Sequence, residues 1–140
     1  MAYTPPTWPV SVKGVALDTQ GRVLLLKNER EQWELPGGRL EPDDPTPEGT
    51  VAREISEESG WNVKAGPLLD VWIYQPLPET MPKRRVVIIT YGCTVLTPDV
   101  TPALSHEHKE IGLFTADEVP GLTMPDGYKQ SIAAWYRRQA

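Results

Sequence analysis

The sequence contains a single cysteine, Cys93, so the chain cannot form an internal disulfide or a cluster of thiolate metal ligands. No apolar run is long enough to cross a bilayer. The first residues, MAYTPPTWPV, lack the basic and apolar regions of a signal peptide. These absences lead us to expect a cytoplasmic protein that does not act at a membrane.

A surplus of positive charge is also missing. The formal net charge is -5, with 14 Lys and Arg against 19 Asp and Glu. Proteins that bind nucleic acid through its phosphates need a basic surface, so we do not expect nucleic acid as a partner. Many of the acids lie between residues 37 and 61, where a bound cation would offset part of their charge.

Proline is plentiful, with 15 residues clustered at 5–9, 42–47, 76–82 and 98–102. Such clusters are typical of loops between strands. A chain of 140 residues, 39% of them apolar, suits one domain with one core. We therefore expect a single domain over residues 1–140, with residues 1–8 forming a loose N-terminal arm.

The segment 46–60 carries the signals of a helix. Thr46 suits the N-cap and Pro47 the first helical position, while Gly60 suits a left-handed C-cap. Ala52, Ile55 and Ser59 form the less polar side, which we expect to pack inward.

A helix turns by about 100° per residue, so Glu54, Glu57 and Glu58 fall on one face. Carboxylates this close repel one another, and a hard cation such as Mg²⁺, which prefers oxygen ligands, would relieve the repulsion. Arg53 lies beside them and could fix one carboxylate by a bidentate contact.

The remaining pattern predicts strands around this helix. Residues 10–17 alternate with a phase slip at Gly14, which suggests a bulge, and a turn leads to a second strand at 22–28 in a hairpin. Further strands are expected within 63–74, at 84–96 and at 110–114, and a C-terminal helix at 127–138. This order predicts an α/β/α sandwich with a mixed sheet between helices.

The segment GGRLEPDDPTPEGTVAREISEESGW, residues 37–61, resembles the Nudix box, G-x5-E-x7-R-E-U-x-E-E-x-G-U, where U is a bulky apolar residue. Gly38 matches the first glycine, and residues 53–61 match the end of the pattern without a mismatch. Asp44 stands where the pattern has Glu, and one extra residue, most simply Pro45, precedes Arg53. The resemblance is to the MutT-like Nudix hydrolases, and it implies the same sandwich fold.

The resemblance also implies roles. It suggests a magnesium-dependent nucleotide pyrophosphatase, in which Mn²⁺ can substitute and the ions polarise the phosphoryl oxygens. Glu57 and Arg53 would be catalytic, with Arg53 orienting the acids. The implied metal ligands are the Gly37 carbonyl, Glu54, Glu57 and Glu58. Glu41 and Asp44 would be secondary participants.

The general base in this family comes from the box or from a loop near the final strand, which here is the segment 105–110. Glu107 is our first candidate for the base or a further metal ligand, and Glu110 the second. His106 and His108 flank Glu107, but two histidines and one acid lack a full zinc ligand set. His108 as a phosphate contact remains an alternative.

Substrate groups would be chosen by other residues. Gly38 lets the backbone approach a ligand closely, and Arg84 and Arg85 could meet a phosphate or a terminal sugar. Trp33 and Tyr74 are candidates for stacking on a base, against the alternative of a core role.

Three functions stay open at this point. The first is hydrolysis of a nucleoside diphosphate linked to another group. The second is a nucleotide sensor on the same fold, and the third is hydrolysis of a non-nucleotide diphosphate. The chain could act as a monomer or a homodimer.

Overall fold

The computed structural model describes residues 2–75, 85–104 and 108–139. In chain order the elements are β1 (Val10–Ala16), β2 (Val23–Lys27), β3 (Trp33–Glu34), β4 (Gly37–Arg39), α1 (Pro47–Ser59), β5 (Val63–Tyr74), β6 (Val86–Val95), β7 (Glu110–Phe114), the 3₁₀ turn η1 (Val119–Gly121) and α2 (Asp126–Gln139). The predicted last strand and both predicted helices are therefore confirmed, to within a residue or two at their ends. No helix in the described ranges has the length and apolar character needed to span a membrane.

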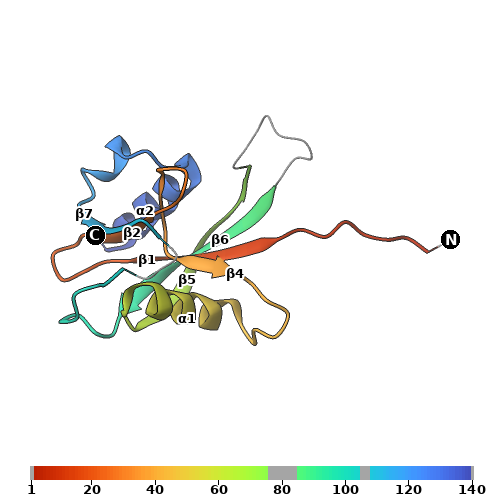
Figure 1. Ribbon diagram of the computed structural model, residues 1–140, viewed down its shortest axis with the longest axis horizontal. Helices are drawn as coiled ribbons and strands as arrows, with labels where there is room; N and C mark the ends of the chain where they lie inside the picture. The colour runs from red at the N-terminus through yellow and green to blue at the C-terminus, as the bar shows by residue number, and fades with distance from the viewer. Residues whose placement is uncertain (1, 76–84, 105–107, 140) are drawn as a thin grey trace.

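The strands form two sheets. The larger has the order β4-β1-β6-β5 and is mixed, because β1 runs parallel to β6 and the other pairs are antiparallel. The smaller has the order β3-β2-β7 and is antiparallel. With α1 on one side of the strands and α2 on the other, this is the predicted α/β architecture with a mixed sheet (Figure 1).

Each helix packs against the strands through its own group of apolar side chains. Val51 and Ile55 of α1 pack with Val12 and Ala16 of β1. Ala52, predicted to face inward with Ile55 and Ser59, is only half-buried, because the buried side of α1 is centred on Val51 and Ile55.

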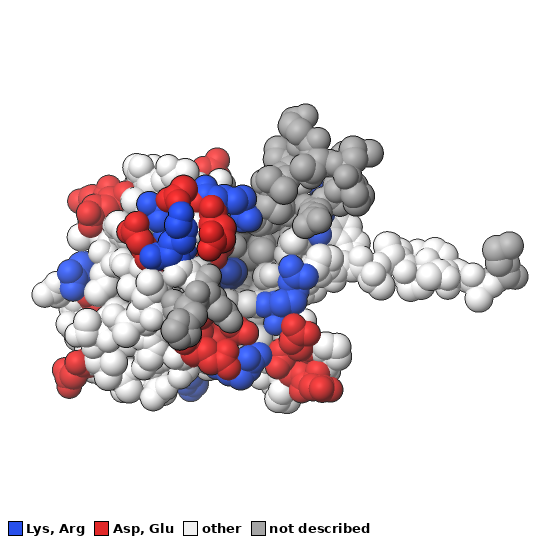
Figure 2. All heavy atoms as spheres, viewed as in Figure 1, with Lys and Arg blue, Asp and Glu red and all other residues white. Residues whose placement is uncertain are grey.

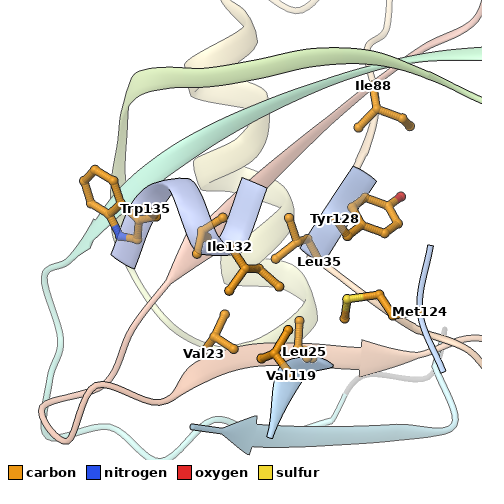
Figure 3. Packing of buried hydrophobic residues seen from close by; sticks show 10 residues of the cluster. Val23, Leu25, Leu35, Ile88, Val119, Met124, Tyr128, Ile132 and Trp135 are labelled. Carbon is orange, nitrogen blue, oxygen red and sulfur yellow. The ribbon is translucent and has the colours of Figure 1, made fainter. Parts of the chain in front are cut away.

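Residues of α2 pack against strands of both sheets. Figure 3 shows Ile132 of α2 close to Val23 and Leu25 of β2, with Tyr128 and Trp135 on either side of it along the same helix. Ile88 of β6 belongs to the same group of buried side chains. The apolar residues whose helical spacing predicted α2 therefore form the side of the helix that contacts both sheets.

Two sequence predictions about the first strands are wrong. The predicted bulge at Gly14 is absent, because Val10–Ala16 pairs with β6 in an unbroken register. Gly14 instead permits close packing: a Cβ there would lie 2.6 Å from Cys93 Sγ and 2.9 Å from atoms of Val51 and Ile55.

The predicted hairpin between the first two strands is reduced to one bridge, Leu17 with Val23. The turn itself forms, since the Asp18 N–H donates to the Arg22 carbonyl. The strands then separate because β1 already has β4 and β6 on its two edges, so β2 must join the other sheet.

Candidate metal and diphosphate site

The ends of α1 are fixed by the predicted caps. Thr46 Oγ1 accepts a hydrogen bond from the Gly49 N–H at 3.0 Å, and Pro47 is the first helical residue. Gly60 adopts a left-handed conformation with φ 81°, and its N–H donates to the Ser56 carbonyl. These caps set where the helix begins and ends.

Glu58 joins this helix to β4. Its side chain is buried, at 3% exposure, and Oε1 accepts the Gly37 N–H at 2.9 Å. Burial raises the pKa of Glu58 to about 7, although the Lys13 charge and the Gly37 hydrogen bond favour the ionised form. The sequence-predicted ligand Glu58 thus lies directly against the backbone of Gly37, another of the four implied ligands.

Glu54 lies against the second glycine. A Cβ on Gly38 would come within 2.6 Å of Glu54 Cδ and 2.8 Å of both carboxylate oxygens. Gly37 has φ 144°, and a Cβ there would collide with the Val12 carbonyl oxygen. Both glycines are therefore needed for the backbone to approach its neighbours this closely.

Arg53 bridges several acids. Its Nη1 lies 3.3 Å from Glu54 Oε1 and 3.3 Å from Glu57 Oε1, and its Nη2 lies 3.4 Å from Asp44 Oδ1. The expected bidentate contact with one carboxylate is replaced by single contacts with three, because the loop before α1 brings Asp44 to the same guanidinium. Asp44 also accepts the Glu41 N–H at 2.9 Å, while the Glu41 side chain is exposed.

A second group of charged residues, which the sequence reasoning missed as a group, surrounds Glu58. His108 Nε2 lies 3.1 Å from Glu34 Oε1 and donates to it, and His108 Nδ1 lies 3.6 Å from Glu58 Oε2. Asn28 Nδ2 donates to the other Glu34 oxygen at 3.3 Å. Lys13 is nearly buried, with its ammonium 5.9 Å from the centre of the Tyr128 ring.

The charges within this group perturb one another. Burial alone would raise the pKa of Glu34, but the His108 hydrogen bond and the Lys13 charge outweigh it and lower the pKa to about 2. The same hydrogen bond raises the pKa of His108 against the effect of burial. One signal could have found Lys13, since it is the one charged residue of β1, a strand of mostly apolar residues.

The other predicted residues lie in varied places. Glu107 and Arg84 fall outside the described residues. Glu110 is exposed and its carboxylate lies 3.6 Å from Lys27 Nζ. The Arg85 guanidinium lies 5.2 Å from the centre of the Trp8 ring, beside the N-terminal segment that leads away from the body in Figure 1.

The two predicted stacking residues are engaged within the protein. Trp33 packs edge-on against Phe114, with ring centres 4.7 Å apart, and Lys27 Nζ lies 5.3 Å from its ring centre. Tyr74 packs against Trp72 and Tyr128, and its hydroxyl donates to Gln32 Oε1 at 3.3 Å. These contacts favour the alternative core role for both rings.

The donor set fits a hard divalent cation, because it consists of carboxylate and carbonyl oxygens held beside a close-packed Gly-Gly backbone. In the described ranges no three Asp, Glu, His or Cys side chains converge on one point. Glu57, whose side chain is 57% exposed and contacts Arg53, is the acid with most freedom to turn toward an ion. On the face shown in Figure 2, acidic and basic side chains are intermixed in small groups.

Comparisons with known proteins show the family to which the chain belongs. The family profile described as NUDIX domain matches residues 7–138. A MutT-like protein of Streptomyces ambofaciens is 46% identical over 119 residues, which are 84% of this chain and 71% of that protein. Human diphosphoinositol polyphosphate phosphohydrolase 3-alpha is 32% identical over 107 residues, which are 75% of this chain and 62% of the human protein.

A solved structure extends the likeness to the whole fold. The crystal structure of a MutT protein from Methanosarcina mazei Go1 superposes with a TM-score of 0.76 at 23% identity, covering 98% of this chain and 99% of that one. The two proteins thus share the arrangement of sheets and helices. An identity of 23% is too low to indicate that they share a substrate.

Proposed function

Because the chain belongs to the Nudix family, whose profile matches residues 7–138, we propose that it is a magnesium-dependent hydrolase of a nucleoside diphosphate joined to a second group. Mn²⁺ would substitute for Mg²⁺. The observation that carries the proposal is the arrangement of α1 against β4, in which Glu58 binds the Gly37 N–H and Glu54 lies against Gly38. We assign the enzyme to the cytoplasm, where nucleotides and magnesium occur together.

The reaction needs positioning and charge neutralisation more than covalent help. A water oxygen attacks one phosphorus, the bridging P–O bond breaks, and a base takes the water proton. The products are a nucleoside monophosphate and the phosphorylated remainder. Bound Mg²⁺ would supply neutralisation of the phosphoryl oxygens, with Glu54, Glu57, Glu58 and the Gly37 carbonyl holding it.

The chain's own residues have distinct parts in this proposal. Arg53 keeps Glu54 and Glu57 near one another through its two 3.3 Å contacts, and Glu57 would turn from this position toward a bound ion. Glu57 acts as a catalytic carboxylate. Glu107 stays our first candidate for the base, with Glu110 second, and Arg84 and Arg85 stay candidates for contacts with the substrate.

The first test is a substrate panel with Mg²⁺, Mn²⁺ or chelator, with the products identified. Glu57→Gln should keep the fold and lose roughly 100-fold or more in magnesium-dependent turnover, because a catalytic carboxylate is removed. Asp117→Asn, which changes an exposed acid between β7 and η1, is the matched control and should keep full turnover. Equal turnover in Glu57→Gln and wild type would defeat the site assignment.

A non-nucleotide diphosphate is the second candidate substrate. It is favoured by the 32% identity to a human enzyme named for diphosphoinositol polyphosphates, although the match spans less than two thirds of that protein. Including a diphosphoinositol polyphosphate in the same panel separates the two candidates. Binding of nucleotides without turnover of any compound would instead support the sensor function, which the complete set of acids in α1 disfavours.

A further inference from the structure

Lys13 is a buried cation that the proposed roles leave unused. It lies in the middle of β1, where its neighbours Val12 and Val15 are fully buried, and it is itself only 8% exposed. Its ammonium makes no hydrogen bond or ion pair with any residue in the described ranges. An ammonium with so little access to water, and with no hydrogen-bond partner among the described residues, gains from an anionic ligand that binds there.

The side chain of Lys13 runs across the Gly-Gly backbone. Lys13 is the register partner of Gly37 in the β1–β4 pair, and a Cβ on Gly37 would lie 3.0 Å from Lys13 Cδ. Beyond that point the ammonium lies 5.9 Å from the Tyr128 ring centre. The charge is therefore presented beside Gly37, the residue that also binds Glu58.

The acids around Lys13 already have donors of their own. Glu58 accepts the Gly37 N–H, and Glu34 accepts from His108 and Asn28. Glu54 contacts Arg53. Burial alone would lower the pKa of Lys13, but Tyr128 and these three acids outweigh it and hold the pKa above its usual range. Among the described residues, these three acids form no ion pair with the Lys13 ammonium.

We propose that Lys13 is a substrate-binding residue whose ammonium takes an anionic oxygen of the diphosphate next to Gly37. The inference rests on the proposed function and deepens it, because it adds a residue from outside the Nudix box to the diphosphate site. A lysine ammonium suits this place because it is a compact charge with three N–H donors. It can bind an oxygen from several directions, whereas the planar guanidinium of arginine donates in a fixed geometry.

The test is a binding titration, in the presence of Mg²⁺, with methylenediphosphonate, a diphosphate analogue whose P–C–P bridge cannot be hydrolysed. Lys13→Met keeps most of the length of the side chain and removes its charge. We expect the dissociation constant of this variant for methylenediphosphonate to rise roughly 10- to 100-fold. Lys64→Met, at an exposed position of β5, is the matched control and should bind as wild type does. A folded Lys13→Met that binds the probe as tightly as wild type overturns the inference.

Measurements on wild type keep the test decisive if Lys13→Met fails to fold. In spectra of ¹⁵N-labelled lysine ammonium groups, assigned with Lys13→Arg, the Lys13 signal should shift when methylenediphosphonate and Mg²⁺ are added. An unmoved Lys13 signal at saturating probe contradicts the inference.

Kinetics separate this inference from the proposed function. With a hydrolysed substrate, Lys13→Met should raise KM more than it lowers kcat, because the contact already exists in the ground state. If wild type hydrolyses the substrate and Lys13→Met has the same KM, the inference fails alone. If wild type hydrolyses nothing in the panel but binds the probe through Lys13, the proposed function fails and the inference stands.

Discussion

At the scale of single residues, the pair formed by Glu34 and His108 places a carboxylate and an imidazole beside Glu58 of α1. His108 Nε2 is bound to Glu34, while its Nδ1 is a buried nitrogen with no hydrogen-bond partner in the described ranges and lies 3.6 Å from Glu58. Glu34 and His108 come from β3 and from the residues before β7, so folding itself creates the pair. Its contribution to stability should therefore depend on pH.

The direction of that dependence follows from the two pKa shifts. The lowered pKa of Glu34 gives stability that is present above its ordinary value of 4.5 and lost as pH falls toward about 2. The raised pKa of His108 gives stability that is present below 6.5 and lost as pH rises through its folded value. The pair thus stabilises the fold most between about pH 4.5 and 6.5.

We predict that Glu34→Gln lowers the free energy of unfolding by about 2 kcal/mol at pH 5.5 and by less at pH 9, because a charge-assisted hydrogen bond is lost. Urea unfolding in chelator at both pH values measures this difference. Glu58, whose pKa is raised by burial, is present in both proteins, so its own pH dependence largely cancels in the comparison. A loss that is the same at both pH values, or larger at pH 9, would show that the charges do not couple.

At the scale of elements, close packing between α1 and β1 depends on Gly14. The helix approaches the strand so closely that a Cβ at this position would meet Cys93 Sγ, Val51 and Ile55 at once. Because α1 carries the acidic face, any shift of the helix would also move Glu54 and Glu58 relative to the Gly-Gly backbone.

We predict that Gly14→Ala destabilises the protein by about 1–3 kcal/mol, as overpacking of a filled interior usually does. Gly121→Ala is the control, because nothing lies within 4 Å of the Cβ that it would add. Thermal unfolding of both variants measures the effect. Equal midpoints for Gly14→Ala and wild type would mean that α1 can move away from β1 without cost.

The sequence predicted α1 and its caps because their signals are local. Thr46, Pro47 and Gly60 act within a few residues of themselves, so their roles can be identified without knowing the rest of the fold. The bulge predicted at Gly14 failed for the opposite reason. Gly14 is required by close contacts with Cys93 on β6 and with α1. Contacts between residues so far apart in the chain leave no periodic pattern in the sequence.

At the scale of the whole molecule, the candidate site draws on both sheets and both helices. Lys13 and Gly37 come from the larger sheet, Glu34 from the smaller, Glu58 from α1 and Tyr128 from α2. The Nudix resemblance supplied the acids of α1, which lie together in the sequence. The cluster of Lys13, Glu34 and His108 could not be predicted, because only the packing of the two sheets brings its members together.

The central claim is that the acids of α1 hold a divalent ion together with a diphosphate. The most direct measurement is a titration of Mn²⁺ followed by electron paramagnetic resonance, with and without methylenediphosphonate. We predict that wild type and Asp117→Asn bind Mn²⁺, more tightly with the diphosphate, and that Glu54→Gln and Glu57→Gln each weaken binding about 10-fold or more. Identical Mn²⁺ binding in all four proteins, or none in wild type beside the diphosphate, would contradict the claim.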